Sequence, residues 1–154
     1  MTNNPVDEKK IEKRMKEICQ AEKSGSYGEI KERLLDKRLN WYKKNDKVIN
    51  KLEGTDVHKA FEMVLFKYMR LKPKEVPVVY EDKEKIVWRS YNWCPVLEAC
   101  KRLKLDTRKV CKKGWEESIQ RLIEGINPKL KFTRNYDILR PHGKYCEESI
   151  ELKK

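Results

Sequence analysis

The sequence has no long apolar run, and its 154 residues include only six glycines, six prolines and two histidines. No segment approaches the roughly 20 apolar residues that cross a bilayer. The N-terminal residues contain neither an apolar signal core nor an arginine-rich presequence. Seven tyrosines and four tryptophans argue against wholesale disorder. We therefore expect a cytoplasmic protein without a membrane partner, folded as a single domain over residues 1–154.

The formal net charge of +12 raises the alternative of a nucleic-acid-binding or regulatory protein. The surplus is spread evenly, because residues 1–75 and 76–154 each carry +6. One basic segment, residues 101–113, has a single acidic residue, Asp106. Its bases are Lys101, Arg102, Lys104, Arg108, Lys109, Lys112 and Lys113. We favour the interpretation that these bases form the solvated side of two short helices in a chain rich in lysine and glutamate.

Residues 7–72 are expected to be helical. Apolar residues recur at helical spacing over about 7–23, 27–53 and 55–68. Ser24-Gly25-Ser26 is expected to end the first helix, and Asn45-Asp46 is a candidate interruption of the second. These helices are a candidate arm for a homodimer, although the same pattern permits a core shared with the rest of the chain.

Residues 76–152 combine strands with two further helices. Val76–Tyr80 and Ile86–Trp88 predict a β-hairpin, and 130–136 with 146–152 predict a second antiparallel pair. Between them, apolar spacing predicts helices over about 96–103 and 110–126. The predicted fold class is α+β, with N-terminal helices followed by antiparallel strands that enclose two helices.

The Cys94-Pro95 dipeptide is the most informative local feature. Proline suits the first position of a helix, which places Cys94 at the N-cap. The helix dipole and free amides there favour a thiolate, so Cys94 is a candidate nucleophile. His142 is a candidate base in a Cys94–His142 dyad if the chain brings the two together. The alternative is a capping residue in a packed turn beside Trp93.

Five cysteines are many for a chain of this size. Their odd number and the lack of a secretion signal disfavour a disulfide framework. Zinc or an iron–sulfur cluster remains an alternative, with the ligands Cys94, Cys100, Cys111 and Cys146. These cysteines lack the close pairs typical of such sites. We therefore expect no cofactor, and we expect Cys100 and Cys111 to be buried on apolar helix faces.

One ordered set of residues resembles a known family. It consists of Cys94-Pro95, Cys100, Cys111, Asn127-Pro128, Phe132, Arg134, Gly143 and Cys146. Over residues 90–152 the chain resembles the C-terminal part of the aminothiazoline-carboxylate hydrolase family and the related 4-vinyl-reductase-type small-molecule-binding domains. The resemblance implies an α+β domain with a small-molecule pocket near the Cys94 turn and the Cys146 strand.

The leading hypothesis is a small-molecule-binding domain with a cysteine-containing pocket, and it leaves open hydrolysis of a small substrate that bears a carboxylate. Arginine presents a planar fork to carboxylates. The candidate ligand-binding residues are Arg89, Trp93, Arg134, Arg140 and Cys146. Glu148 shares a strand face with Cys146 in the predicted strand, but we expect it to be a surface residue.

Overall fold

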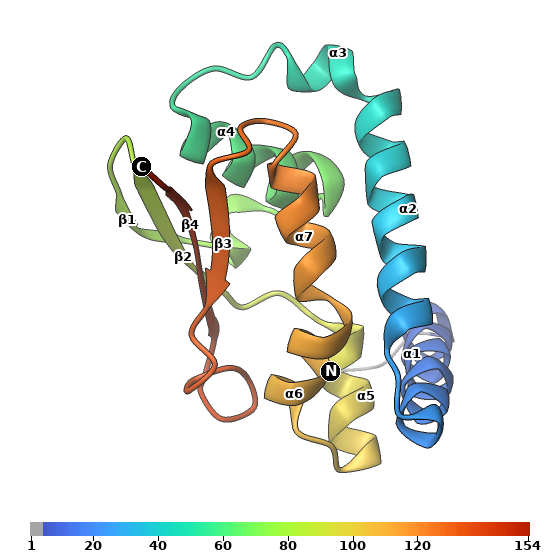
Figure 1. The fold of residues 1–154 in the computed structure, drawn as a ribbon. Helices are drawn as coiled ribbons and strands as arrows, with labels where there is room; N and C mark the ends of the chain where they lie inside the picture. Colours follow the sequence, from blue (N-terminus) through green and yellow to red (C-terminus); the bar gives the residue numbers. More distant parts are fainter. Residues whose placement is uncertain (1–4) are drawn as a thin grey trace.

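The structure, a computed structural model that describes residues 5–154, consists of helices packed on one antiparallel sheet (Figure 1). The helices are α1 (Pro5–Ser24), α2 (Gly28–Lys44), α3 (Asp46–Ile49), α4 (Asp56–Phe61), the π-helix η1 (Glu62–Tyr68), the 3₁₀ turn η2 (Pro73–Glu75), α5 (Pro95–Leu103), α6 (Thr107–Gly114) and α7 (Glu116–Ile123). The strands are β1 (Val78–Glu81), β2 (Lys85–Ser90), β3 (Leu130–Arg134) and β4 (Cys146–Leu152). The predicted α+β class is confirmed.

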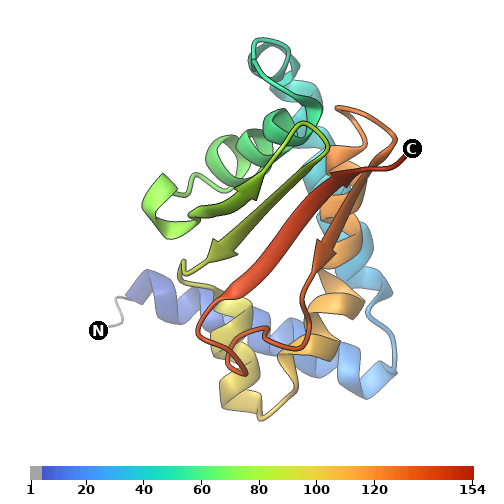
Figure 2. The same cartoon turned by 90° about the vertical axis from the view of Figure 1, so that its left-hand side faces the viewer.

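The four strands form one sheet in the order β1-β2-β4-β3, and every neighbouring pair is antiparallel. Both predicted strand pairs are present, and the pairing of β2 with β4 joins them. Ile86, Ile150 and Phe132 lie side by side across the three strands β2, β4 and β3 and are buried under the helices. Figure 2 looks onto the outer face of the sheet, with the helices behind it. The inner face therefore supplies the core.

Buried apolar residues form two clusters. One lies between the inner face of the sheet and α4, η1 and α7, and the other joins α1, α2, α5 and α6. Helix α1 packs against α5, and α2 packs against α7. Ile11 and Ile18 of α1 are fully buried inside the chain. A homodimer through these helices remains a prediction, and it would have to use their polar faces.

The region from residue 107 to 123 differs from the single helix expected over 110–126. It is split into α6 and α7, because Trp115 leaves regular helix geometry with φ −117°. Arg38 of α2 reaches the break and donates from Nη1 to Ser118 Oγ at 2.6 Å and to the Trp115 carbonyl oxygen at 3.5 Å. The Trp115 carbonyl oxygen at the break is thus hydrogen-bonded by a buried side chain of another helix.

The helix expected over 55–68 starts as predicted, since the Thr55 side chain caps α4 by accepting from the His58 N–H. From Glu62 the backbone changes to the π-helix η1. The wider turn allows three consecutive residues, Met63, Val64 and Leu65, to be buried. No helix in residues 5–154 has both the length and the apolar composition needed to cross a membrane.

Helix α7 is fixed to the edge strand β3 by one side chain. Gln120 donates to the Leu130 carbonyl oxygen at 2.9 Å and accepts from the Phe132 N–H at 2.8 Å. The amide thereby occupies backbone groups that a further strand would otherwise use. Ile119, the neighbouring residue of α7, belongs to the core cluster beneath the sheet.

Candidate functional site

A cavity of about 100 Å³ lies against the inner face of the sheet. Its walls come from η1, α6, α7, the three strands β2, β3 and β4, and the segments that precede α5 and β4. Four of the predicted catalytic and ligand-binding residues line it: Cys94, Arg134, Arg140 and Cys146. The topology thus brings together residues that are up to 52 positions apart in the sequence.

A buried ion pair forms part of the lining. Arg134 Nε donates to Glu148 Oε2 at 2.8 Å, and the two side chains are only 12% and 11% exposed. Ser90 Oγ donates to the other oxygen, Glu148 Oε1, at 2.8 Å. Burial lowers the pKa of Arg134, but the neighbouring charge of Glu148 outweighs it and leaves the pKa above its usual value. Arg134 is therefore a permanent cation in the cavity wall.

Two buried donors of the lining residues have no hydrogen-bond partner within residues 5–154. They are Nη1 of Arg134 and Nε1 of Trp88, and Trp88 is only 1% exposed. A buried N–H without an acceptor costs about 1–3 kcal/mol, and more when the group is charged. Most buried polar groups in proteins are paired, so such donors are notable features of a cavity.

Arg140 supplies a second positive charge. Its Nη1 donates to the Asn92 carbonyl oxygen at 2.7 Å, and its Nε lies 3.2 Å from Cys146 Sγ. In the described part of the chain, Arg140 forms no ion pair with a carboxylate. Among the lining residues, Arg134 and Arg140 face a single acidic residue, Glu148, so the cavity wall carries a formal charge of +1. This charge favours an anionic occupant.

Cys94 is at the N-cap of α5 with Pro95 at the first helical position, as predicted. The surroundings of the thiol do not favour the expected thiolate. Burial raises the pKa of the Cys94 thiol, and this effect outweighs the opposing influence of the Leu97 and Val96 amides and of Arg140. Burial also raises the pKa of Cys111 and of Cys100 to about 12. Burial therefore favours the neutral form of the Cys94 thiol.

The structure does not assemble the Cys94–His142 dyad. His142 Nε2 lies 3.5 Å from Asp106 Oδ1, at the start of α6, and His142 does not line the cavity that contains Cys94. Asp106 is the N-cap of α6 and accepts from the Arg108 N–H. The turn that carries His142 therefore faces the cap of α6 instead of the Cys94 thiol.

Two other predicted ligand-binding residues also lie outside the cavity. Arg89 is on the outer face of the sheet, with its guanidinium carbon 4.5 Å from the Tyr145 ring centroid and its Nε 3.5 Å from Glu147 Oε2. Trp93 packs against the helical core cluster. The alternation of side chains along a strand explains why Arg89 faces outward, because Trp88 and Ser90 on either side of it face inward.

The cysteines of the metal alternative are only partly gathered. Cys94, Cys111 and Cys146 line the cavity, whereas Cys100 is buried in the helical core. Within residues 5–154, no three His, Cys, Asp or Glu side chains are arranged to hold a metal ion. The prediction of no cofactor and the zinc or iron–sulfur alternative both stay open to elemental analysis.

The basic segment 101–113 lies on α5, α6 and the loop between them. Three of its seven bases pair with carboxylates: Lys101 with Glu98, Arg102 with Glu8 and Arg108 with Asp106. Two more lie over tyrosine rings, Lys112 over Tyr136 and Lys113 over Tyr27. These contacts fit the solvated helix face that the sequence favours. Nucleic-acid binding through this segment remains a prediction.

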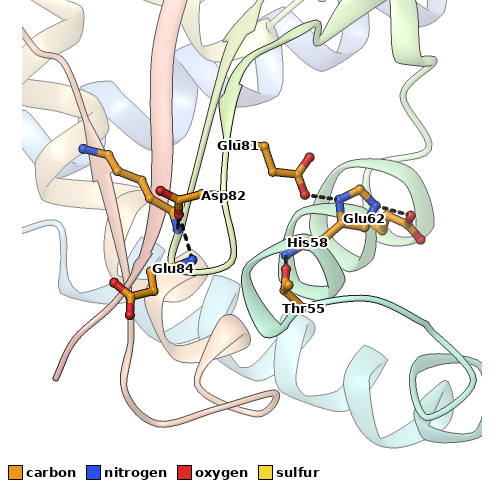
Figure 3. A network of polar contacts seen from close by, with 7 residues as sticks. Thr55, His58, Glu62, Glu81, Asp82 and Glu84 are labelled. Carbon is orange, nitrogen blue, oxygen red and sulfur yellow. Dashed lines mark hydrogen bonds and ion pairs between the residues drawn. The ribbon is translucent and has the colours of Figure 1, made fainter.

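A second polar cluster joins α4, η1 and the edge strand β1 (Figure 3). His58 Nδ1 lies 2.8 Å from Glu81 Oε2, and His58 Nε2 lies 2.7 Å from Glu62 Oε1. Only a protonated imidazole can donate from both nitrogens. Burial lowers the pKa of His58, but the hydrogen bonds to Glu81 and Glu62 outweigh it and raise the pKa above its usual value.

The His58 cluster predicts a pH-dependent contribution to stability. Because the pKa of His58 is higher in the folded chain than in the unfolded chain, the contribution is complete below about pH 6.5. It is lost as the pH rises through the higher folded-state pKa. The three side chains are about one-third exposed, so we expect the contribution to be at most about 1 kcal/mol.

Urea unfolding of the protein and of His58→Gln at about pH 6 and about pH 8.5 measures this contribution. The variant should be less stable than the parent at the lower pH, and the difference should shrink at the higher pH. His142→Gln, which removes the other histidine, serves as the matched control. A His58→Gln variant whose stability deficit does not change with pH would rule out the charged clamp.

Sequence reasoning missed much of the cavity wall, including Trp88, Ser90 and Glu148 on the inner face of the sheet. The alternation of inward-facing and outward-facing side chains along β2 and β4 could have identified these residues. Ile86, Trp88 and Ser90 occupy one face of β2, and Cys146, Glu148 and Ile150 occupy one face of β4. An acidic residue between Cys146 and a buried isoleucine indicates a polar site rather than a surface position once the inner face of β4 is known.

The chain matches no protein-family model, and no curated protein or solved structure shows a significant match to it.

Proposed function

We propose that this protein binds a small molecule with one carboxylate group in the cavity between the sheet and the helices. One observation carries the proposal: the cavity wall has a net positive charge, and a buried N–H of one of its arginines has no acceptor. Arg134 and Arg140 are the residues that would hold the carboxylate. Cys94 and Cys146 lie beside them in the same wall.

The chemistry of the arginines favours a carboxylate over a neutral ligand. Arg134 already uses Nε for Glu148, which leaves Nη1 for another acceptor. Arg140 is neutralised by no carboxylate in the described part of the chain. A carboxylate oxygen satisfies both needs through charge-assisted hydrogen bonds, which are about twice as strong as neutral ones. The resemblance of residues 90–152 to small-molecule-binding domains supports the same kind of occupant.

We propose that the protein binds its small-molecule ligand and does not hydrolyse it. A cysteine nucleophile needs a thiolate or an adjacent base, and burial keeps the Cys94 thiol neutral. Glu148 is the carboxylate of the cavity wall, and its two oxygens are engaged by Arg134 and Ser90. His142 lies at Asp106. The arrangement of Cys94, Glu148 and His142 thus gives no support to a proton-transfer step.

Propionate and propionamide test the proposal, because the two molecules have the same shape and differ in charge. Free carboxylates of this size bind weakly, so each is added at about 50 mM, with sodium chloride at the same concentration as the reference. Propionate should raise the melting temperature above that in chloride, as a ligand of the folded state does. Propionamide should not. An equal effect of the amide, or no effect of propionate, contradicts the proposal.

A further inference from the structure

The polar and apolar groups of the cavity are arranged in rows across the sheet. Strand register places Ser90 opposite Cys146, and the next inner row contains Trp88, Glu148 and Arg134. The row after that contains only Ile86, Ile150 and Phe132. The inner face therefore changes from polar to apolar along the strands, and the two donors without acceptors both belong to the row at the boundary.

These two donors belong to one packed group. The Arg134 guanidinium carbon lies 5.1 Å from the centroid of the Phe132 ring. The Trp88 ring is stacked with Phe132, with centroids 6.3 Å apart. Glu148 occupies the strand position between Trp88 and Arg134, and both of its oxygens are engaged. The row of Trp88, Glu148 and Arg134 thus offers hydrogen-bond donors to a ligand. It has no free carboxylate oxygen that could accept a hydrogen bond from the ligand.

The Trp88 donor needs a neutral acceptor rather than a second carboxylate. An indole N–H donates one hydrogen bond and accepts none, and Trp88 is 1% exposed, belongs to the apolar core cluster and lies opposite the Glu148 carboxylate. A ketone oxygen accepts hydrogen bonds without bringing a charge or a donor into such surroundings. A ligand hydroxyl or ammonium group would instead bring a donor for which this row has no free carboxylate.

The small size of the cavity places the two acceptors of the ligand close together. An apolar cavity of about 150 Å³ holds benzene, whereas this one measures about 100 Å³. A ligand of this size that carries a carboxylate and a second acceptor has room for only a few carbons, and placing both groups on neighbouring carbons leaves the most space for an apolar end. Apolar side chains of the helices, including Val64, Leu65 and Ile119, remain for a short hydrocarbon end.

We propose that the ligand is a small 2-oxo acid, whose carboxylate is held by Arg134 and Arg140 and whose oxo oxygen accepts from Trp88 Nε1. This inference rests on the proposed function, and it adds the identity of the second functional group. No bond is formed or broken in the complex. Trp88 is the residue that distinguishes an oxo acid from other acids of the same size.

Pyruvate, isobutyrate and alanine test the inference, because they share the carboxylate and the number of non-hydrogen atoms. They differ at the second carbon, which carries an oxo, a methyl or an ammonium group. Affinity is measured by NMR titration of the full chain with each probe. Pyruvate should bind about tenfold more tightly than isobutyrate, the value of one neutral hydrogen bond. Alanine should bind most weakly, since its ammonium group meets two arginines.

The variant Trp88→Phe removes the N–H and keeps an aromatic ring. It should lower pyruvate affinity to about that of isobutyrate measured in the same variant, so that the preference for pyruvate disappears. Trp41→Phe is the matched control, because Trp41 does not line the cavity. The indole resonance that disappears in Trp88→Phe identifies Trp88, and in the parent this resonance should shift with pyruvate and not with isobutyrate.

The outcomes separate this inference from the function on which it rests. If pyruvate and isobutyrate bind equally well and the Trp88 indole resonance does not move, the oxo acid is wrong while carboxylate binding stands. If none of the three acids binds in the cavity, the proposed function fails as well. A preference for pyruvate that persists in Trp88→Phe would also overturn the role of Trp88.

Discussion

Replacement of Arg134 by methionine is expected to lower the free energy of unfolding by about 3–5 kcal/mol, the cost of leaving one partner of a buried ion pair alone. Arg134 and Glu148 are 12% and 11% exposed. Without Arg134, the Glu148 carboxylate would keep only the hydrogen bond from Ser90. Urea unfolding at neutral pH measures the loss.

Two further variants show whether the cost comes from the stranded charge. Adding Glu148→Gln to Arg134→Met should recover part of the stability, because the second change neutralises the buried group. Arg89→Met breaks the more exposed pair with Glu147 on the outer face, and it should cost less than about 1 kcal/mol. If Arg134→Met costs no more than Arg89→Met, then a stranded charge at Glu148 does not destabilise the fold as expected.

Replacement of Arg140 by glutamine is expected to reduce the affinity for propionate by about 10- to 100-fold, the range for a hydrogen bond to a charged group. The fold should survive, because Arg140 contacts a backbone carbonyl oxygen and a sulfur but no carboxylate in the described residues. NMR titration gives the affinity, and thermal melting checks the fold.

Arg140→Lys and Arg89→Gln are the matched variants. Lysine keeps the charge of Arg140 but loses the planar fork, so its affinity should fall between those of the parent and of Arg140→Gln. Arg89 was an equally good candidate in the sequence, yet it lies on the outer face of the sheet. Arg89→Gln should bind propionate like the parent. Loss of binding in Arg89→Gln and not in Arg140→Gln would place the ligand on the outer face of the sheet and would contradict the proposed site.

Local features of the fold were predictable because local chemistry decides them. Pro95 fixes the start of α5, Thr55 caps α4, and the polar turn between Tyr80 and Ile86 closes the first hairpin. Residues 130–134 and 146–152 form strands where apolar and polar residues alternate. In each case the deciding interactions involve residues only a few positions apart.

Features that depend on distant partners could not be predicted. The pairing of β2 with β4 joins segments about 60 residues apart, and no local pattern specifies it. The break at Trp115 depends on Arg38 from α2, which reaches the groups that the break exposes. The π-helix keeps the apolar pattern of an ordinary helix, so its wider turn is invisible to periodicity.

The candidate site was likewise predictable where residue chemistry decides it and unpredictable where the fold decides it. Residue chemistry singled out Cys94, Arg134, Arg140 and Cys146, and they share one cavity. Chemistry alone did not separate Arg89 from the other arginines, because strand alternation decides which side of the sheet a residue faces. The sequence did not show that Cys94 would be buried, and burial raises the pKa of its thiol against the opposing influence of the helix N-terminus.

The most direct measurement is a titration of the uniformly ¹⁵N-labelled full chain with propionate, followed by backbone amide NMR. We expect the shifts to concentrate on the residues around the cavity, including Ser90, Asn92, Arg134, Arg140 and Cys146, and to be absent with propionamide. Shifts confined to the basic segment 101–113, or no shifts at all, would contradict carboxylate binding in the cavity.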